Sequence, residues 1–105
     1  MEHAFNGDFN QILSKIENGV LNGSASAFLE DSSDFFSKDA RSSVRVFERY
    51  SYSGSNRVSM NATLFQSGNG PVHLSAIAAD GSQTLFFKIN TWGEKSFLDT
   101  LRDIL

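Results

Sequence analysis

Residues 57–66 read Arg-Val-Ser-Met-Asn-Ala-Thr-Leu-Phe-Gln and show the most regular pattern in the chain. Apolar residues occupy alternate positions, namely Val58, Met60, Ala62 and Leu64. Between them stand Arg57, Ser59, Asn61 and Thr63. Because successive side chains of a strand point to opposite faces, this alternation predicts a strand with one buried face. The fold is therefore expected to contain a sheet that turns one face to the core.

Similar runs on both sides of this stretch predict four more strands, at about residues 24–30, 44–52, 72–79 and 83–89. Short segments with glycine, such as Ser67-Gly68-Asn69-Gly70, separate most of them. Links this short join antiparallel neighbours, since parallel strands need crossovers of about a dozen residues. The strands are expected to form an antiparallel meander, with the Ser- and Asp-rich residues 31–43 as a long loop.

Both ends of the chain are predicted to be helical, because apolar residues recur there every three or four positions. The first helix carries Phe9, Ile12, Leu13, Ile16 and Val20. Asp8 and Gln11 have the spacing of a capping box at its start, and Asn18-Gly19 is expected to end it. The last helix carries Phe97, Leu98, Leu101, Ile104 and Leu105, with Thr91 and Glu94 in capping-box spacing before them.

These elements predict a single α+β domain over residues 1–105. It is expected to be a two-layer sandwich, an antiparallel meander sheet of about five strands with the N- and C-terminal helices packed on one face. The face under the helices is expected to hold Ala25, Ala27, Leu29, Val44, Val46, Val58, Met60, Ala62, Leu64, Val72, Leu74, Ala76, Ala78, Leu85, Phe87 and Ile89. A chain of 105 residues is long enough to bury one such core.

Composition and charge narrow the class of protein. The chain has no cysteine, which excludes disulfides, thiolate metal sites and cysteine nucleophiles. It shows neither a signal peptide nor the run of about 20 apolar residues that spans a membrane, so a cytoplasmic location is expected. The net charge of −3 argues against nucleic acid as the partner, because phosphate binding needs clustered Lys and Arg.

Five short segments stand out together: Gly23-Ser24-Ala25-Ser26-Ala27, Val44-Arg45-Val46-Phe47-Glu48-Arg49-Tyr50, Asn56-Arg57-Val58-Ser59, Trp92-Gly93-Glu94 and Phe97-Leu98-Asp99-Thr100-Leu101. In these segments the chain resembles a small uncharacterised bacterial protein family of unknown function. The resemblance spans most of the chain. It implies no activity, no cofactor and no functional residue.

The sequence selects no catalytic, cofactor-binding or metal-binding residue. His3 lies in a terminus expected to be frayed, and His73 stands alone in its strand, whereas a metal site needs three or four converging ligands. No serine occupies a Gly-x-Ser-x-Gly elbow. No cofactor is therefore expected. A hydrolase-type enzyme built from Asp, Glu, Ser and Tyr is an alternative that no motif favours.

One large apolar residue per strand is expected to point away from the helices. The chain holds ten phenylalanines, and strict alternation sends four of them and one isoleucine to that opposite face. The candidate binding or interface patch comprises Phe28, Arg45, Phe47, Arg49, Phe65, Ile77, Phe86 and Lys88. An open antiparallel face is normally polar, so an apolar patch there indicates a function or a cover.

Three interpretations of the patch stay open. Phe35 and Phe36, in the expected loop, would make a second core if the loop folded over this face. Protein association, most often as a homodimer, would bury the patch against a partner. A ligand site would bind a small apolar molecule. Aromatic residues interleaved with Arg also occur in single-stranded nucleic-acid binders, but the acidic net charge argues against that function.

Overall fold

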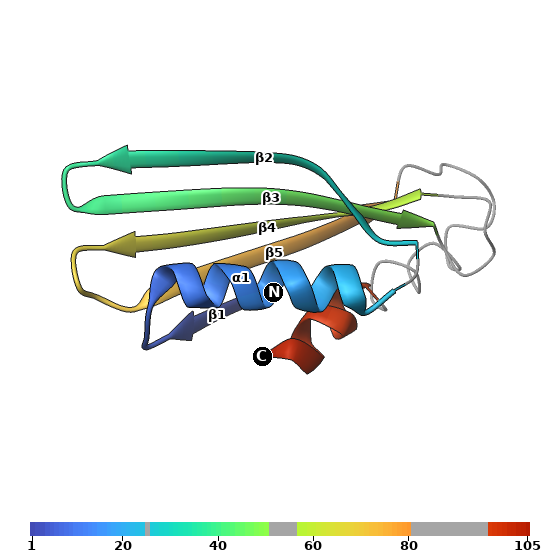
Figure 1. Cartoon of the computed structure of the whole chain (residues 1–105), viewed down its shortest axis with the longest axis horizontal. Coiled ribbons are helices and arrows are strands. Elements are labelled where there is room, and N and C mark those ends of the chain that lie inside the picture. Colours follow the sequence, from blue (N-terminus) through green and yellow to red (C-terminus); the bar gives the residue numbers. More distant parts are fainter. Residues whose placement is uncertain (25, 51–56, 81–96) are drawn as a thin grey trace.

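The computed structural model describes residues 1–24, 26–50, 57–80 and 97–105 (Figure 1). Its elements are β1 (Glu2–Phe5), α1 (Phe9–Asn22), β2 (Phe28–Ser37), β3 (Ala40–Tyr50), β4 (Arg57–Ser67) and β5 (Val72–Asp80). A further helical segment covers residues 97–104. The strands form one antiparallel sheet in the order β1-β5-β4-β3-β2. The α+β class predicted from the sequence is confirmed.

The meander consists of β2, β3, β4 and β5, and the fifth place in the sheet belongs to β1. Residues 2–5 were expected to be frayed, but they pair with β5. The Met1 amino group donates to the Ala76 carbonyl at 2.8 Å, and the Ala76 N–H donates to the Met1 carbonyl at 2.8 Å. These bonds fix the start of the chain. The strand predicted at 83–89 lies outside the described residues.

The loop predicted at residues 31–43 is wrong. Most of this stretch belongs to β2 and to the start of β3, which pair from Ser37 and Ala40 outward. Lys38 adopts a left-handed backbone angle (φ 52°) in the turn between them. This turn contains neither Gly nor Pro, so the sequence lacks the strongest signals of a turn there. Ser and Asp are tolerated because all ten residues of β2 are exposed and none has to fill a core.

Helix α1 begins as predicted, since Asp8 Oδ2 accepts the Gln11 N–H at 2.9 Å. It ends later than predicted, with Gly23 at the C-cap rather than at Asn18-Gly19. Gly19 has another role. A Cβ added to it would lie 2.4 Å from Ile104 Cδ1, and a Cβ at Gly23 would lie 2.6 Å from Thr100 Cγ2. The two glycines, one turn apart, let the helical segment 97–104 pack closely against α1.

The core lies between these helices and one face of the sheet, here called the helix face (Figure 1). Its buried apolar residues are Phe9, Ile16, Val20, Phe47, Val58, Met60, Ala62, Leu64, Val72, Leu74, Ala76, Phe97 and Leu101. The alternation read for β4 and β5 is confirmed. The inward placement of Val44 and Val46 is wrong, because their cross-strand partners are Thr63 and Asn61. Both valines therefore lie on the opposite face, here called the open face.

The close contact at Gly19 predicts an unusual response to a helix-favouring substitution. Gly19→Ala should lower the melting temperature by several degrees, although alanine is the better helix former by about 1 kcal/mol. The new methyl group overlaps Ile104, and overpacking of this kind costs about 1–3 kcal/mol. Thermal denaturation followed by circular dichroism measures the change.

Asn18→Ala is the matched control, because Asn18 is exposed on the same helix and should gain stability from the same propensity term. In the double variant Gly19→Ala/Ile104→Ala, the cost should be smaller than the sum of the two single costs, since the overlapping atoms are gone. A rise in melting temperature for Gly19→Ala would show that the two helices do not touch at this point.

Candidate interaction surface

Three residues of the predicted patch lie on the open face. Phe28, Phe65 and Ile77 are 37%, 44% and 65% exposed, and they come from β2, β4 and β5. Their cross-strand partners Glu48, Ser42 and Asn61 lie on the same face, so alternation placed them correctly. Phe86 and Lys88 lie outside the described residues. The open face therefore carries large apolar side chains, but not the full set expected.

Phe47, Arg45 and Arg49 are not on this face, so their predicted orientation is wrong. Phe47 is fully buried in the core, and Arg45 is 8% exposed. Arg49 pairs across the sheet with Val58, a core residue, and so shares the helix face. The alternation of β3 was assigned with the opposite phase, because Val44 and Val46 outweighed a single phenylalanine.

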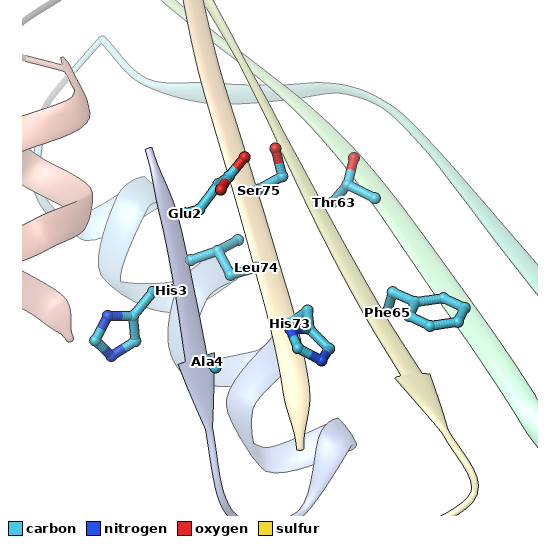
Figure 2. Close-up of a pocket in the computed structure, with 8 residues that line it drawn as sticks. All are labelled: Glu2, His3, Ala4, Thr63, Phe65, His73, Leu74 and Ser75. Carbon is cyan, nitrogen blue, oxygen red and sulfur yellow. The ribbon is translucent and has the colours of Figure 1, made fainter. Parts of the chain in front are cut away.

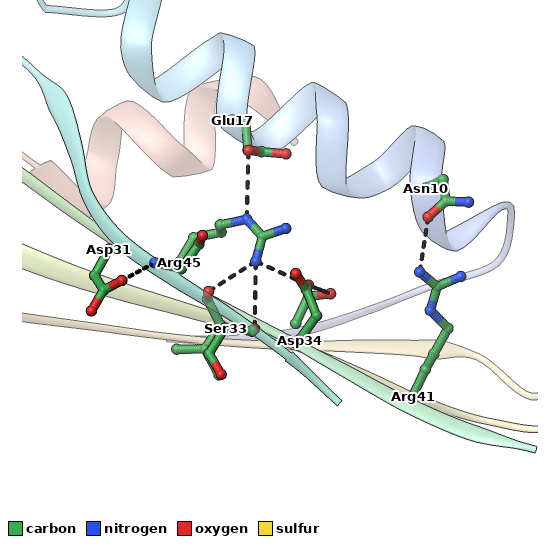
Figure 3. A network of polar contacts seen from close by, with 10 residues as sticks. Asn10, Glu17, Asp31, Ser33, Asp34, Arg41 and Arg45 are labelled. Carbon is green, nitrogen blue, oxygen red and sulfur yellow. Dashed lines mark hydrogen bonds and ion pairs between the residues drawn. The ribbon is translucent and has the colours of Figure 1, made fainter. Parts of the chain in front are cut away.

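Arginines of β3 lie on the helix face, where their side chains stack on aromatic rings of the core. The guanidinium carbon of Arg41 lies 3.9 Å from the centroid of the Phe9 ring, and that of Arg49 lies 4.4 Å from the Phe97 ring. Arg41 also donates to Asn10 Oδ1 at 2.9 Å (Figure 3). Long arginine stems cover apolar surface while their heads reach polar groups at its rim. These side chains fasten the helices to β3.

Arg45 lies at the centre of a polar network that joins α1 to β2 (Figure 3). Its Nε lies 3.5 Å from Glu17 Oε2, and its Nη1 lies 3.1 Å from Asp34 Oδ1. The Ser43 hydroxyl donates to the same Asp34 oxygen at 2.6 Å. This hydrogen bond and the charge of Arg45 hold the pKa of Asp34 below its ordinary value of 3.8. The carboxylate therefore stays charged to lower pH than a free Asp, and the stability that this pair contributes is lost as the pH falls from about the ordinary pKa through the lowered one.

Arg49 is a further arginine of β3 that is partly buried against a helix. Burial lowers the pKa of its guanidinium, which remains charged at neutral pH. Its Nη1 donates to Thr100 Oγ1 at 3.5 Å, a contact between β3 and the helical segment 97–104. Arg45 and Arg49 thus stabilise the packing of the helices and are not available as part of a surface patch.

Phe35 and Phe36, which were expected in a loop, are strand residues. They lie in β2 and are 64% and 72% exposed. Phe35 faces Ser42, the partner of Phe65, so it belongs to the open face. Phe36 faces Arg41 on the helix face, with the guanidinium carbon 5.0 Å from its ring centroid. Neither residue covers the open face as a second core.

A shallow hollow of about 450 Å³ lies on the sheet beside Phe65, across β1, β5 and β4 (Figure 2). It is lined by Glu2, His3, Ala4, Thr63, Phe65, His73, Leu74 and Ser75. Glu2 pairs across the strands with Ser75, and Ala4 pairs with His73. His3 alternates with these residues and points to the other side of β1 (Figure 2). The two histidines therefore do not converge.

Two features are absent from the described residues, a cluster of metal-ligating side chains and a membrane-spanning helix. Within residues 1–24, 26–50, 57–80 and 97–105, no three His, Asp or Glu side chains gather closely enough to hold a metal ion. In the same residues, no helix is long and apolar enough to cross a membrane. What the described residues offer on the surface is apolar contact area and the outer edge of β2, with which no described strand pairs.

Fold and surface together define a class, the two-layer α+β proteins whose antiparallel sheet is covered by helices on one face. The chain belongs to a family of unknown function, DUF6054, whose model matches residues 1–105. Membership in a family of unknown function agrees with the resemblance read from the sequence. No curated protein and no solved structure matches the chain.

Proposed function

We propose that this protein is a non-catalytic association module that forms a homodimer through apolar side chains of β2 and the open face. The observation that carries the proposal is the exposure of four large apolar residues there, Phe28, Phe35, Phe65 and Ile77. Apolar side chains gathered on one exposed face usually mark an interaction surface, and a twofold dimer is the commonest assembly.

The surroundings of these residues support association rather than catalysis. Val44 and Val46 lie between the phenylalanines on the same face and are half-buried. Arg57 at one end of the face is paired with Glu30 and Glu48, so its charge is already compensated. The face therefore offers apolar area with few free charges, which is the character of an interface core.

Light scattering tests the proposal through the mass of the protein in solution. The parent chain should show twice the monomer mass, and Phe35→Glu, in the exposed strand β2, should shift it to the monomer while leaving the circular dichroism spectrum unchanged. A carboxylate at an apolar interface loses hydration without gaining a partner. Ser14→Glu, on the exposed side of α1, is the matched charge control and should leave the dimer intact. A parent that is monomeric at high concentration would contradict the proposal.

A small apolar ligand is the second candidate partner, and the hollow at Phe65 favours it. Its volume falls within the range of roughly 300–1,000 Å³ that is typical of ligand pockets. An apolar fluorescent dye should then bind the parent and lose affinity in Phe65→Ala.

The bacterial source and the cytoplasmic location remain predictions from the sequence.

A further inference from the structure

Strand β2 is the last strand of the sheet, and no described strand pairs with its outer edge (Figure 1). It is ten residues long, and every one of its residues is exposed. Natural proteins usually keep edge strands short, protect them with charged side chains, Pro or a bulge, or cover them. Residues 28–37 contain neither Pro nor Lys, and their protection is confined to three acidic residues and the register shift after Leu29. This edge therefore has the features of a site for strand addition.

The apolar residues of β2 occur as two adjacent pairs, Phe28-Leu29 and Phe35-Phe36, one near each end of the strand. Neighbouring residues of a strand point to opposite faces, so each pair exposes one apolar side chain on each face. A partner lying on the open face would contact only half of them. A strand placed alongside β2 would contact all four.

Pairing with β3 assigns each residue of β2 to a face. The register shifts between Leu29 and Asp31, so Glu30 is the extra residue of a bulge. The residues on the open face are Phe28, Asp31, Ser33 and Phe35. Those on the helix face are Leu29, Ser32, Asp34 and Phe36. The bulge lets Phe28 and Phe35 share a face although seven positions separate them.

This arrangement is complementary to itself in an antiparallel pairing. With Ser32 of two copies opposite each other and the bulge present in both, every opposed pair lies on one face. Phe28 then faces Phe35 of the second copy, twice in the dimer, and Asp31 faces Ser33. Leu29 faces Asp34. No two acidic residues stand directly opposite, which would be destabilising, and cross-strand aromatic pairs are favourable.

We propose that β2 pairs antiparallel with β2 of a second copy about a twofold axis at Ser32, joining the two sheets into one continuous sheet. This inference rests on the homodimer proposed above and specifies its geometry. It also extends the open face across both copies, because the axis is perpendicular to the sheet. Phe28 and Phe35 of the two copies then form one aromatic cluster on each side of the axis.

One hydrogen bond within β2 competes with the proposed pairing, so removing it should change the strength of dimerisation. The Ser32 N–H donates to Asp31 Oδ1 at 2.8 Å. The Ser32 N–H already has an acceptor on its own strand. We therefore infer that it does not donate to β3 and that it faces the outer edge of the sheet. The joining strand must displace this carboxylate. Asp31→Ala should therefore strengthen dimerisation about tenfold, given the strength of a hydrogen bond to a charged acceptor.

Disulfide formation tests the register, because the chain has no cysteine of its own. Paired Cα atoms in an antiparallel ladder lie roughly 5.5 Å or 4.5 Å apart, within the range that a disulfide spans. Ser32→Cys should give a covalent dimer under mild oxidation, seen on a non-reducing gel. Ser33→Cys is the matched control. Its counterpart would be offset by two residues, at about 8 Å, which is beyond disulfide reach.

The outcomes separate this inference from the proposed function. A parent dimer in which Ser32→Cys fails to cross-link, or in which Ser33→Cys cross-links instead, overturns the β2 pairing and leaves the association module standing. A monomeric parent without cross-linking overturns both. Light scattering of Asp31→Ala provides the second readout. Weaker association in this variant would contradict edge pairing at Ser32, whatever the gel shows.

Discussion

Phe47→Glu should abolish cooperative folding of this protein. The side chain of Phe47 is fully buried in the core between β3 and the helices. Removing a buried phenylalanine costs about 3–5 kcal/mol, and an unpaired carboxylate in the same place adds several more. That sum is comparable to the whole stability of a small protein, about 5–15 kcal/mol. Thermal denaturation followed by circular dichroism should show no transition.

Phe65→Glu is the matched control, because it makes the same exchange on the next strand. Phe65 is 44% exposed on the open face, so the new carboxylate keeps contact with water. The fold should survive with a melting transition close to that of the parent. A folded Phe47→Glu variant with an unchanged melting temperature would mean that β3 presents its other face to the helices.

Leu101→Asp should also unfold the protein, or at least release the helical segment 97–104 from the sheet. Leu101 is fully buried, and it packs in the same core cluster as Phe97. The loss of a buried leucine costs about 2–5 kcal/mol before the burial of a charge is counted. The helical signal in circular dichroism and the melting temperature should both fall.

Arg102→Ala tests the neighbouring position on the exposed side of that segment. Arg102 forms a surface ion pair with Asp99 at 2.7 Å, with both side chains about half exposed. Such pairs contribute roughly 0–1 kcal/mol, so stability should hardly change. Equal effects of Leu101→Asp and Arg102→Ala would show that the segment is not docked through Leu101.

The sequence was most informative where one face of a strand is fully covered. In β4, every second residue from Val58 to Leu64 is buried, so burial imposes a strict alternation that can be read directly. The stripe of the last helix is equally clear, because Phe97 and Leu101 have to fill the same core. The α+β class followed from these segments.

The phase of β3 could not be read because two signals compete in it. Val44 and Val46 are better strand formers than Arg45, and an arginine is rarely assigned to a core face. Only the structure shows that Arg45 forms ion pairs with Glu17 and Asp34. These partners come from α1 and β2, far away in sequence. A single-sequence pattern contains no information about such contacts.

The candidate surface was predicted in part for the same reason. Phe28, Phe65 and Ile77 followed from alternation, whereas the part of β2 beyond residue 30 was missed because it buries nothing. A strand whose ten residues are all exposed has no hydrophobic period to display. Its only sequence signal was the pairing of apolar residues at 28–29 and 35–36, which breaks alternation rather than following it.

The position of β1 in the sheet has a consequence for the order of folding. Strands β2 to β5 are neighbours along the chain, and each successive pair closes through a short connection or segment. β1 pairs with β5, and the Met1–Ala76 bond joins residues 75 positions apart. Non-local pairing requires a large loop to close first, so it forms late. Amide hydrogen exchange should therefore be faster at residues 2–5 than in the centre of β4.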